Sequence, residues 1–323
     1  MKAYLWLGAS ILMACKGQTL EVGSADGGAS GSSSGTTDIS PSSFGAPTPV
    51  EQHILNPPLV LASDGVDLFW SDHPQTLWRD PVGGGAPTQI ASGTLLSLDS
   101  TNVYFVEYGT GFASAPKAGG ATSTLIPVTG AIAAATVAAG IVYWVETDQA
   151  TSGPEIPAMK SAPLVPGGTV TTLGTIPNVL PATSIAVVGS TIFLVVGAGG
   201  LFQNDGGAPI PLGAGASGCV AFLAGTDGVY CGENSGPLVF VALDGTTTTQ
   251  IATETNGATH MALDATNVYW TNETASGSVV TAPLNGGANI TIANDTYPVA
   301  VAVDDAAVYW SDNVGNLERA AKQ

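Results

Sequence analysis

The sequence predicts an all-β fold, namely a seven-bladed β-propeller in which each blade contains four antiparallel strands. Three features of the 323-residue chain support this prediction. One short motif recurs about every 40 residues, Gly-rich turns fall at matching places between its copies, and no segment has a helical period. Four short strands joined by tight turns need about 40 residues, which is the length of a propeller blade.

The recurring motif is an apolar strand that contains an aromatic pair. Its clearest copies are Leu263–Asn272 (LDATNVYWTN) and Val303–Asp312 (VDDAAVYWSD). The first aromatic residue of each copy marks seven units: Phe69, Tyr104, Tyr143, Phe193, Tyr230, Tyr269 and Tyr309. Because these strands are apolar at successive positions, we expect both of their faces to be covered by neighbouring sheets.

Each unit supplies three further strands around this motif. In the sixth unit we expect them at Thr259–Leu263, Val279–Ala282 and Asn289–Ile292, with the pair Gly286–Gly287 in the turn before the last one. Glycine pairs provide the positive φ that tight hairpins need. The residues that precede the aromatic strands are expected to form turns: Asp64, Asp67, Asp99, Asn102, Asp227, Asp264, Asp304 and Asp305.

The seventh unit lacks a fourth strand, because the chain stops at Gln323 soon after the third one. Residues 51–55 (EQHIL), ahead of the first unit, resemble the fourth strand of the fifth unit, Thr249–Ala252 (TQIA). We therefore expect this N-terminal segment to pair with the last blade and close the ring. Closure would remove the exposed strand edges of an open arrangement.

Three copies of the motif resemble the YWTD repeats of low-density-lipoprotein-receptor-type propellers: Phe69–Asp72 (FWSD), Tyr269–Asn272 (YWTN) and Tyr309–Asp312 (YWSD). The resemblance extends over roughly residues 50–323. In that family the propellers bind partners or pack against neighbouring modules and carry out no chemistry. The resemblance therefore implies a binding role.

The N-terminus has the features of an export signal. Lys2 is followed by the 12 residues Ala3–Ala14, which are almost all apolar and too few to form a transmembrane helix. Leu12–Cys15 (LMAC) resembles the lipobox of bacterial lipoproteins, which implies cleavage after residue 14 and lipidation of Cys15. The alternative is a secreted protein that loses Cys15 together with its signal.

Residues 15–47 predict a flexible tether, since Gly and Ser dominate and apolar residues are isolated. We thus divide the chain into a signal peptide (1–14), the tether (15–47) and the propeller (48–323). This order indicates an exported protein that is lipid-anchored to the cell envelope, at the outer membrane or the cell surface.

The charge composition excludes two classes of partner. The chain has 25 acidic and 7 basic residues, a formal net charge of −18. Nucleic acids and anionic lipid head groups are bound by clusters of Lys and Arg. We therefore expect no nucleic-acid partner and membrane attachment through the lipid anchor only. We also expect a monomer.

Acidic residues follow the aromatic strands, where propeller topology would bring them to one rim of the disc: Asp72, Glu107, Glu146, Asp148, Glu233, Glu273 and Asp312. A ring of carboxylates could hold Ca²⁺, which takes six to eight oxygen ligands, or attract a cationic partner. The alternative is that the acid of each copy accepts backbone hydrogen bonds that fasten neighbouring blades, while the others are solvated.

The histidines His53, His73 and His260 fall in different blades, so their spacing predicts no zinc site and no catalytic nucleophile. His260, on an innermost strand, is the candidate for a side chain facing the channel. Trp78 and Tyr108 are the aromatic candidates for an exposed contact. The remaining tryptophans of the motif are expected to pack between blades: Trp70, Trp144, Trp270 and Trp310.

Cys219 and Cys231 flank the turn Gly225–Gly228 in the fifth unit and are equally distant from Gly225 in sequence, so they could lie nearly opposite each other in one hairpin. In an exported protein such a pair favours a disulfide, and the alternative is two buried thiols.

The function predicted from the sequence is that of a binding module. Its acidic rim would recognise an envelope or extracellular protein, a glycan or a small ligand. The alternative is a propeller enzyme, such as a metal-dependent lactonase or a polysaccharide lyase.

Overall fold

The structure is a computed structural model of the chain. It describes residues 43–52, 54, 56–73, 75–147, 157–176, 182–196, 200–204, 210–212, 218–233, 236–245, 247–253 and 258–323. The predicted signal peptide, Cys15 and most of the predicted tether lie outside these residues, as do His53 and Asp148.

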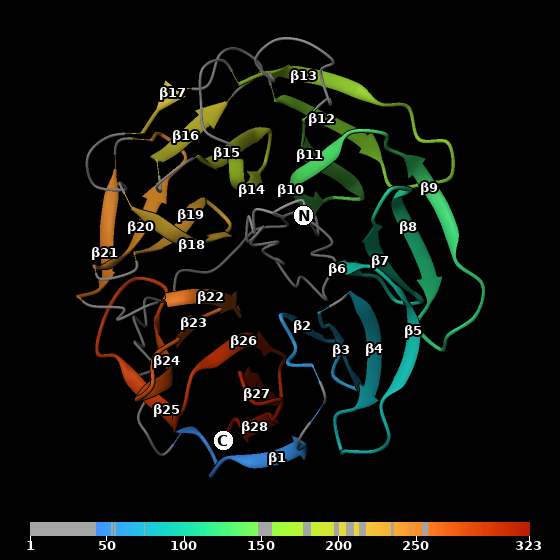
Figure 1. Cartoon of the computed structure of the whole chain (residues 1–323). Helices are drawn as coiled ribbons and strands as arrows, with labels where there is room; N and C mark the ends of the chain where they lie inside the picture. Colours follow the sequence, from blue (N-terminus) through green and yellow to red (C-terminus); the bar gives the residue numbers. More distant parts are fainter. Residues whose placement is uncertain are drawn as a thin grey trace, which may run out of the picture.

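Seven four-stranded antiparallel sheets are arranged around a common axis, so the fold is the predicted seven-bladed β-propeller (Figure 1). Within each blade the first strand is innermost and the fourth is outermost. Among the described residues there is no helix long and apolar enough to cross a membrane.

The first four blades follow one another along the chain. Blade 1 contains β2 (Val60–Ser63), β3 (Asp67–Ser71), β4 (Thr76–Pro81) and β5 (Thr88–Ser92). Blade 2 contains β6 (Thr94–Leu98), β7 (Asn102–Glu107), β8 (Gly111–Pro116) and β9 (Ser123–Pro127). Blade 3 contains β10 (Ala131–Ala138), β11 (Ile141–Thr147), β12 (Ala158–Pro163) and β13 (Thr171–Thr175). Blade 4 contains β14 (Ala182–Val188), β15 (Thr191–Val196), β16 (Gly200–Asn204) and β17 (Ile210–Pro211).

The last three blades complete the ring. Blade 5 contains β18 (Cys219–Ala224), β19 (Gly228–Glu233), β20 (Leu238–Ala242) and β21 (Thr248–Ala252). Blade 6 contains β22 (Ala258–Leu263), β23 (Asn267–Asn272), β24 (Gly277–Pro283) and β25 (Ile290–Asp295). Blade 7 contains β26 (Pro298–Val303), β27 (Ala307–Asp312), β28 (Leu317–Ala321) and, as its outermost strand, β1 (Thr48–Glu51).

The N-terminal strand closes the ring as predicted, but it lies a few residues earlier in the chain than the segment 51–55. In β1, Thr48 pairs with Arg319 of β28, and Glu51 pairs with Leu317 (Figure 1). Phe44, which the sequence analysis assigned to the tether, packs edge-on against Tyr269 of blade 6. The chain therefore contacts the disc from Phe44, four residues ahead of β1.

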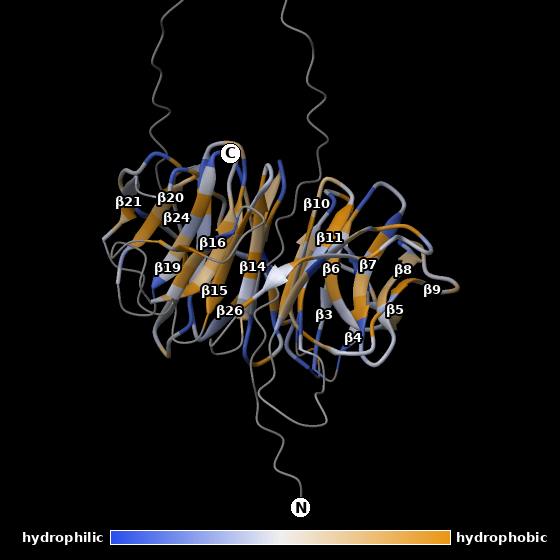
Figure 2. Cartoon of the chain, turned by 90° about the horizontal axis from the view of Figure 1, so that it is seen from above, coloured by the Kyte–Doolittle hydropathy of each residue, from blue (hydrophilic) through white to orange (hydrophobic). Residues whose placement is uncertain are grey.

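The second strand of each blade forms the centre of the core. Trp70, Trp144, Trp270 and Trp310 are fully buried, as are the aromatic residues that precede them in the first, sixth and seventh units, Phe69, Tyr269 and Tyr309. Figure 2 shows the disc from the side, with hydrophobic residues concentrated in the strands and hydrophilic ones at the turns of both faces. This burial confirms that the aromatic strands are covered on both sides.

Two lysines join neighbouring blades on the face that carries the turns between first and second strands. Lys117 of blade 2 lies 2.7 Å from the carboxylate of Asp64 in blade 1. Lys322, after β28, lies 2.7 Å from the carboxylate of Asp264 in blade 6. Burial raises the pKa of Asp264, but hydrogen bonds from Lys322 and Tyr269 outweigh this effect and hold it below its usual value.

Candidate functional site: the loop face

The loops that follow the aromatic strands all lie on one side of the disc, because they connect the second and third strands of every blade. The connections between successive blades reach the same side. We call this side the loop face, and the opposite side the turn face. The predicted acidic rim belongs to the loop face.

Three of the predicted rim acids are buried, and two of them, Asp72 and Asp312, fix the loops in which they lie. Asp72 accepts hydrogen bonds from the backbone N–H of Thr76 (3.0 Å) and from the indole N–H of Trp78 (2.8 Å). Asp312 accepts hydrogen bonds from the backbone N–H groups of Val314 and Asn316. Both carboxylates therefore shape the hairpin between the second and third strands of their own blade.

Glu146 performs a similar task in blade 3. Its carboxylate accepts hydrogen bonds from the backbone N–H of Gly130 (3.0 Å), the indole N–H of Trp144 (2.9 Å) and the ammonium of Lys160 (2.9 Å). Burial raises the pKa of Glu146, but these three donors outweigh the effect and lower it overall. This carboxylate is accordingly held in the charged form by partners inside the protein.

Hydroxyl groups that directly follow the tryptophan of the motif fasten neighbouring blades to each other. Ser71 accepts a hydrogen bond from the backbone N–H of Leu95 in blade 2, and Thr271 donates one to the carbonyl of Val299 in blade 7. Ser311 donates to the carbonyl of Pro58 (2.8 Å), just ahead of blade 1. The inter-blade role that the sequence analysis offered as the alternative for the acids belongs to these Ser and Thr side chains.

The remaining described acids of the predicted rim are more accessible. Glu273 is exposed, while Glu107 and Glu233 are half-buried. They belong to blades 6, 2 and 5, respectively, so the structure places them on one face without bringing them together. In the described part of the chain, no three Asp, Glu, His or Cys side chains are grouped as ligands of one metal ion.

Two exposed tyrosines lie on the loop face beside these acids. Tyr108 follows Glu107 in the β7–β8 loop and is 53% exposed. Tyr297 lies in the connection between β25 and β26 and is 39% exposed. Its backbone is in the left-handed region, with φ 51°, which costs about 1–2 kcal/mol for a residue with a Cβ atom. The fold thus holds an aromatic side chain outward at a strained position.

The basic residues of the described chain are engaged within the protein. Arg79 pairs with Asp67 at 2.8 Å, Lys160 pairs with Glu146, and Arg319 donates a hydrogen bond to the carbonyl of Val82. Lys117 and Lys322 form the inter-blade ion pairs described above. The accessible charge that remains on this part of the surface is therefore acidic, as the net charge of the sequence suggests.

His260 is the only titratable side chain that does not form a disulfide on the seven innermost strands, all of which are described. It is half-buried in β22, and its Nδ1 atom lies 3.2 Å from the hydroxyl of Thr259. Burial lowers the pKa of His260 to about 4, so its imidazole is neutral at physiological pH. The other six innermost strands consist of uncharged residues, mainly Ala, Val and Leu.

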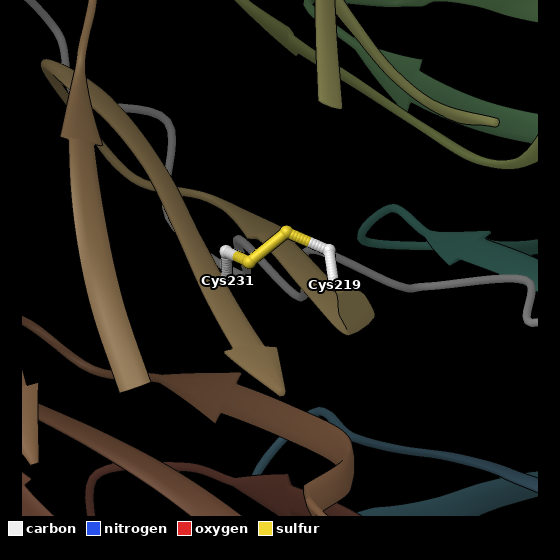
Figure 3. Close-up of a disulfide and its surroundings, with 2 residues drawn as sticks. All are labelled: Cys219 and Cys231. Atoms are coloured by element: carbon white, nitrogen blue, oxygen red, sulfur yellow. A yellow bond between two sulfur atoms is a disulfide. The ribbon is translucent and has the colours of Figure 1, made fainter. Parts of the chain in front are cut away.

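Cys219 and Cys231 form a disulfide between adjacent strands of blade 5 (Figure 3). They are not directly opposite each other, because Cys219 pairs with Glu233 and Cys231 pairs with Phe222. The register shifts between Cys219 and Ala221, and the disulfide spans the pair diagonally with a Cα–Cα distance of 5.4 Å.

A shallow cavity of about 320 Å³ lies away from the axis, between the outer parts of blades 5 and 6. Its lining is uncharged and mixes polar with apolar residues: Gln250, Ile251, Ala252, Thr253, Gly287 and Asn289. It contains none of the residues that the sequence analysis named as binding, metal or channel candidates.

The sequence analysis did not identify Tyr297, Lys117 or Lys322. A sequence signal for Lys117 and Lys322 does exist, because they occupy the same position of the repeat. Each lies two residues after an Ala near the end of a third strand. Tyr297 has no such signal, since its left-handed backbone depends on how blades 6 and 7 are joined.

No protein-family model matches the chain, and no curated protein matches its sequence. Solved structures share its fold. The WD40 β-propeller domain of Doa1 aligns with a TM-score of 0.66 and 12% identity, over 87% of this chain and 97% of that one. Virginiamycin B lyase from Staphylococcus aureus aligns with a TM-score of 0.62 and 14% identity, over 86% and 98%. At such identities the likeness concerns the fold alone, and the chain is a seven-bladed β-propeller.

Proposed function

We propose that this protein is an exported lipoprotein whose propeller binds a partner protein of the cell envelope or its surroundings through the loop face. The observation that carries the proposal is the combination of exposed Tyr108 and Tyr297 with accessible acids on a surface whose described bases are all engaged. Tyrosine is enriched in protein interfaces, because it provides a large contact area and a polar tip.

The expected partner presents a basic patch. Glu107 and Glu273 would attract Lys and Arg side chains, and the net charge of −18 would speed the encounter at low salt. Propellers such as the Doa1 WD40 domain support an interaction module in general terms. The fold alone does not decide the function, since a lyase shares it as well.

The proposed anchor is the lipidated Cys15, with residues 15–47 as the tether. The support is the sequence Lys2–Cys15 and the Gly/Ser-rich composition that follows it. Growth of the producing cells with a labelled fatty acid tests this part: the wild type should incorporate label and Cys15→Ala should not. Label on Cys15→Ala would contradict the anchor and leave the binding proposal standing.

Site-specific photocrosslinking tests the binding face. A photoreactive phenylalanine analogue at position 108 or 297 should capture one partner in the envelope of the producing cell, and the same analogue at Val66 on the turn face should not. Val66 is a suitable control because it is 68% exposed. Equal capture from Val66 would refute the assignment of the face.

Tyr297→Asn supplies a variant that separates binding from folding. Asn tolerates the left-handed backbone better than Tyr, so the stability should stay unchanged or rise. With the captured partner purified, we expect the affinity to fall by about tenfold or more, as for the loss of an interface tyrosine. An unchanged Kd would exclude Tyr297 from the interface.

A further inference from the structure

The seam between blade 7 and blade 1, where the ring closes, contains a pair of acidic residues at positions that are apolar at most other seams. Asp80 lies in the third strand of blade 1, where it pairs with Leu68. Glu51 lies in the fourth strand of blade 7, where it pairs with Leu317. Both positions can be compared from blade to blade, because the strand registers repeat.

The position of Asp80 is taken by small or apolar residues in five of the other six blades. The equivalent residues, identified from the pairing of second and third strands, are Ala115, Ala162, Asn204, Val241, Ala282 and Ala320. The outer-strand position of Glu51 is taken by Ala91, Ile126, Ala252 and Ala293 in four blades. At these four seams, the two equivalent residues belong to the same buried apolar cluster.

At the closing seam, carboxyl groups therefore occupy both of the positions that are apolar at these four seams. Asp80 is 0% exposed, and no donor in the described part of the chain reaches either of its oxygen atoms. The backbone of β1 follows the β4–β5 hairpin closely, since a Cβ atom on Gly84 would lie 3.3 Å from the carbonyl oxygen of Val50. The side chain of Glu51 is near enough for its charge to act on the Asp80 carboxyl and raise the pKa of Asp80.

The cations around this pair have other partners. Arg79, next to Asp80, pairs with Asp67 of β3, which is the third carboxylate in the neighbourhood. Arg319 of β28 donates its hydrogen bond to the carbonyl of Val82. A buried carboxylate (Asp80) and a half-buried one (Glu51) without a cation repel each other, whereas one proton between them allows an O–H···O hydrogen bond.

We propose that Asp80 and Glu51 form a proton-binding site that ties the closing strand β1 to blade 1, and that one proton shared between them strengthens the closure of the ring. The site is satisfied when one carboxyl is protonated and is opened by repulsion when both are charged. Burial, followed by the charge of Glu51, raises the pKa of Asp80 to about 6, in agreement with this arrangement.

The sign of the pH effect follows from linkage. The folded state binds this proton more tightly than the unfolded state does, because the pKa of Asp80 is raised above its ordinary value of 3.8. Its contribution to stability is fully present below pH 4 and is lost as the pH rises through about 6. For one proton, the folding equilibrium constant falls about tenfold per pH unit in this window.

The variant Asp80→Asn tests the proposal in the full chain. The Asn amide can donate to Glu51 at every pH, so the ratio of folding equilibrium constants, variant over wild type, should rise about tenfold per pH unit from pH 4 to 6 and then level off. Denaturant titrations at several pH values measure this ratio. Asp305→Asn, at an exposed aspartate, is the control and should give a constant ratio.

Two further measurements settle the outcome. Hydrogen exchange of wild-type β1 should lose protection from pH 5 to pH 8, relative to β9, which has no titratable side chain. This readout needs no variant to fold. A pH-independent ratio for Asp80→Asn, or constant protection of β1, would overturn the proposal. So would Ca²⁺ that stabilises the wild type but not Asp80→Asn at pH 7.5, because a cation and not a proton would then fill the site.

Discussion

Lys117 and Lys322 occupy equivalent positions in blades 2 and 7 and make the same contacts with the preceding blade. Each ammonium lies 2.7 Å from an aspartate of the turn between first and second strands. Each also lies over an aromatic ring of the second strand, Phe69 at 5.5 Å and Tyr269 at 5.4 Å from the centroid. The same kind of lysine–aspartate contact, which we call the clamp, thus occurs at two of the seven seams between blades.

Lys322→Met should destabilise the protein by about 1–2 kcal/mol, because it leaves the partly buried Asp264 carboxylate without its cation. Denaturant unfolding at pH 7 measures the change, with Asp305→Asn as the exposed control. A change below 0.3 kcal/mol would mean that the clamp contributes no net stability.

The same ion pair predicts a pH dependence of the opposite sign to that of the closing seam. The pKa of Asp264 is lowered in the folded state, so its contribution is present above the usual pKa of Asp and is lost as the pH falls through the folded value. The stability difference between the wild type and Lys322→Met should therefore shrink in acid. A difference that grows below pH 4 would contradict this assignment.

The buried tryptophans differ in how their indole N–H groups are satisfied. Trp310 donates to Asp295 at 2.8 Å, whereas the N–H of Trp70 has no partner among the described residues. Trp310→Phe should lower the free energy of unfolding by about 1–2 kcal/mol more than Trp70→Phe does, since only the former breaks a hydrogen bond. Both substitutions remove the same volume, so the pair serves as its own control in unfolding experiments.

Ser311 of β27 forms one hydrogen bond to the segment ahead of blade 1 and one within blade 7. It donates to Pro58 and accepts from the backbone N–H of Ala300 (3.1 Å). Ser311→Ala leaves two buried backbone groups unpaired and should lower the free energy of unfolding by about 1–3 kcal/mol. Ser190→Ala, at an exposed serine, should have no measurable effect on the unfolding midpoint, and equal effects of the two would exclude this role.

Removal of the disulfide should destabilise the hairpin β18–β19. The bond closes a loop with a sequence separation of 12, for which chain entropy gives about 3 kcal/mol. Unfolding of the double variant Cys219→Ala/Cys231→Ala, compared with the wild type, measures this cost. An identical stability would show that the strand pairing alone fixes the hairpin.

The architecture was predictable because its signal is repeated. A strand that is apolar on both faces must be covered on both sides, as it is in the middle of a blade between two neighbouring blades. The seven copies of this strand predict the number of blades. The closing strand was predicted from the resemblance of residues 51–55 to Thr249–Ala252, but Thr48–Glu51 forms the strand. Strand position depends on pairing with β28, which a four-residue resemblance does not resolve.

The roles of individual acids could not be predicted in the same way. Asp72 and Glu273 follow the aromatic strand at similar distances, yet one is buried under N–H donors and the other is exposed. This difference arises from the conformation of each loop. The pair Asp80 and Glu51 could not be predicted either, because Glu51 reaches the seam with blade 1 only through the pairing of β1 with β28 at the other end of the propeller.

Because β1 and β28 share one sheet, the final blade is assembled from both ends of the propeller chain. During synthesis on the ribosome, Thr48 emerges early, but it can form its strand pair only after Arg319 has been synthesised. Six sheets can form while the chain is still growing, whereas the seventh needs the completed polypeptide. The pairing of β1 with β28 is therefore a long-range contact, which we expect to form late in folding.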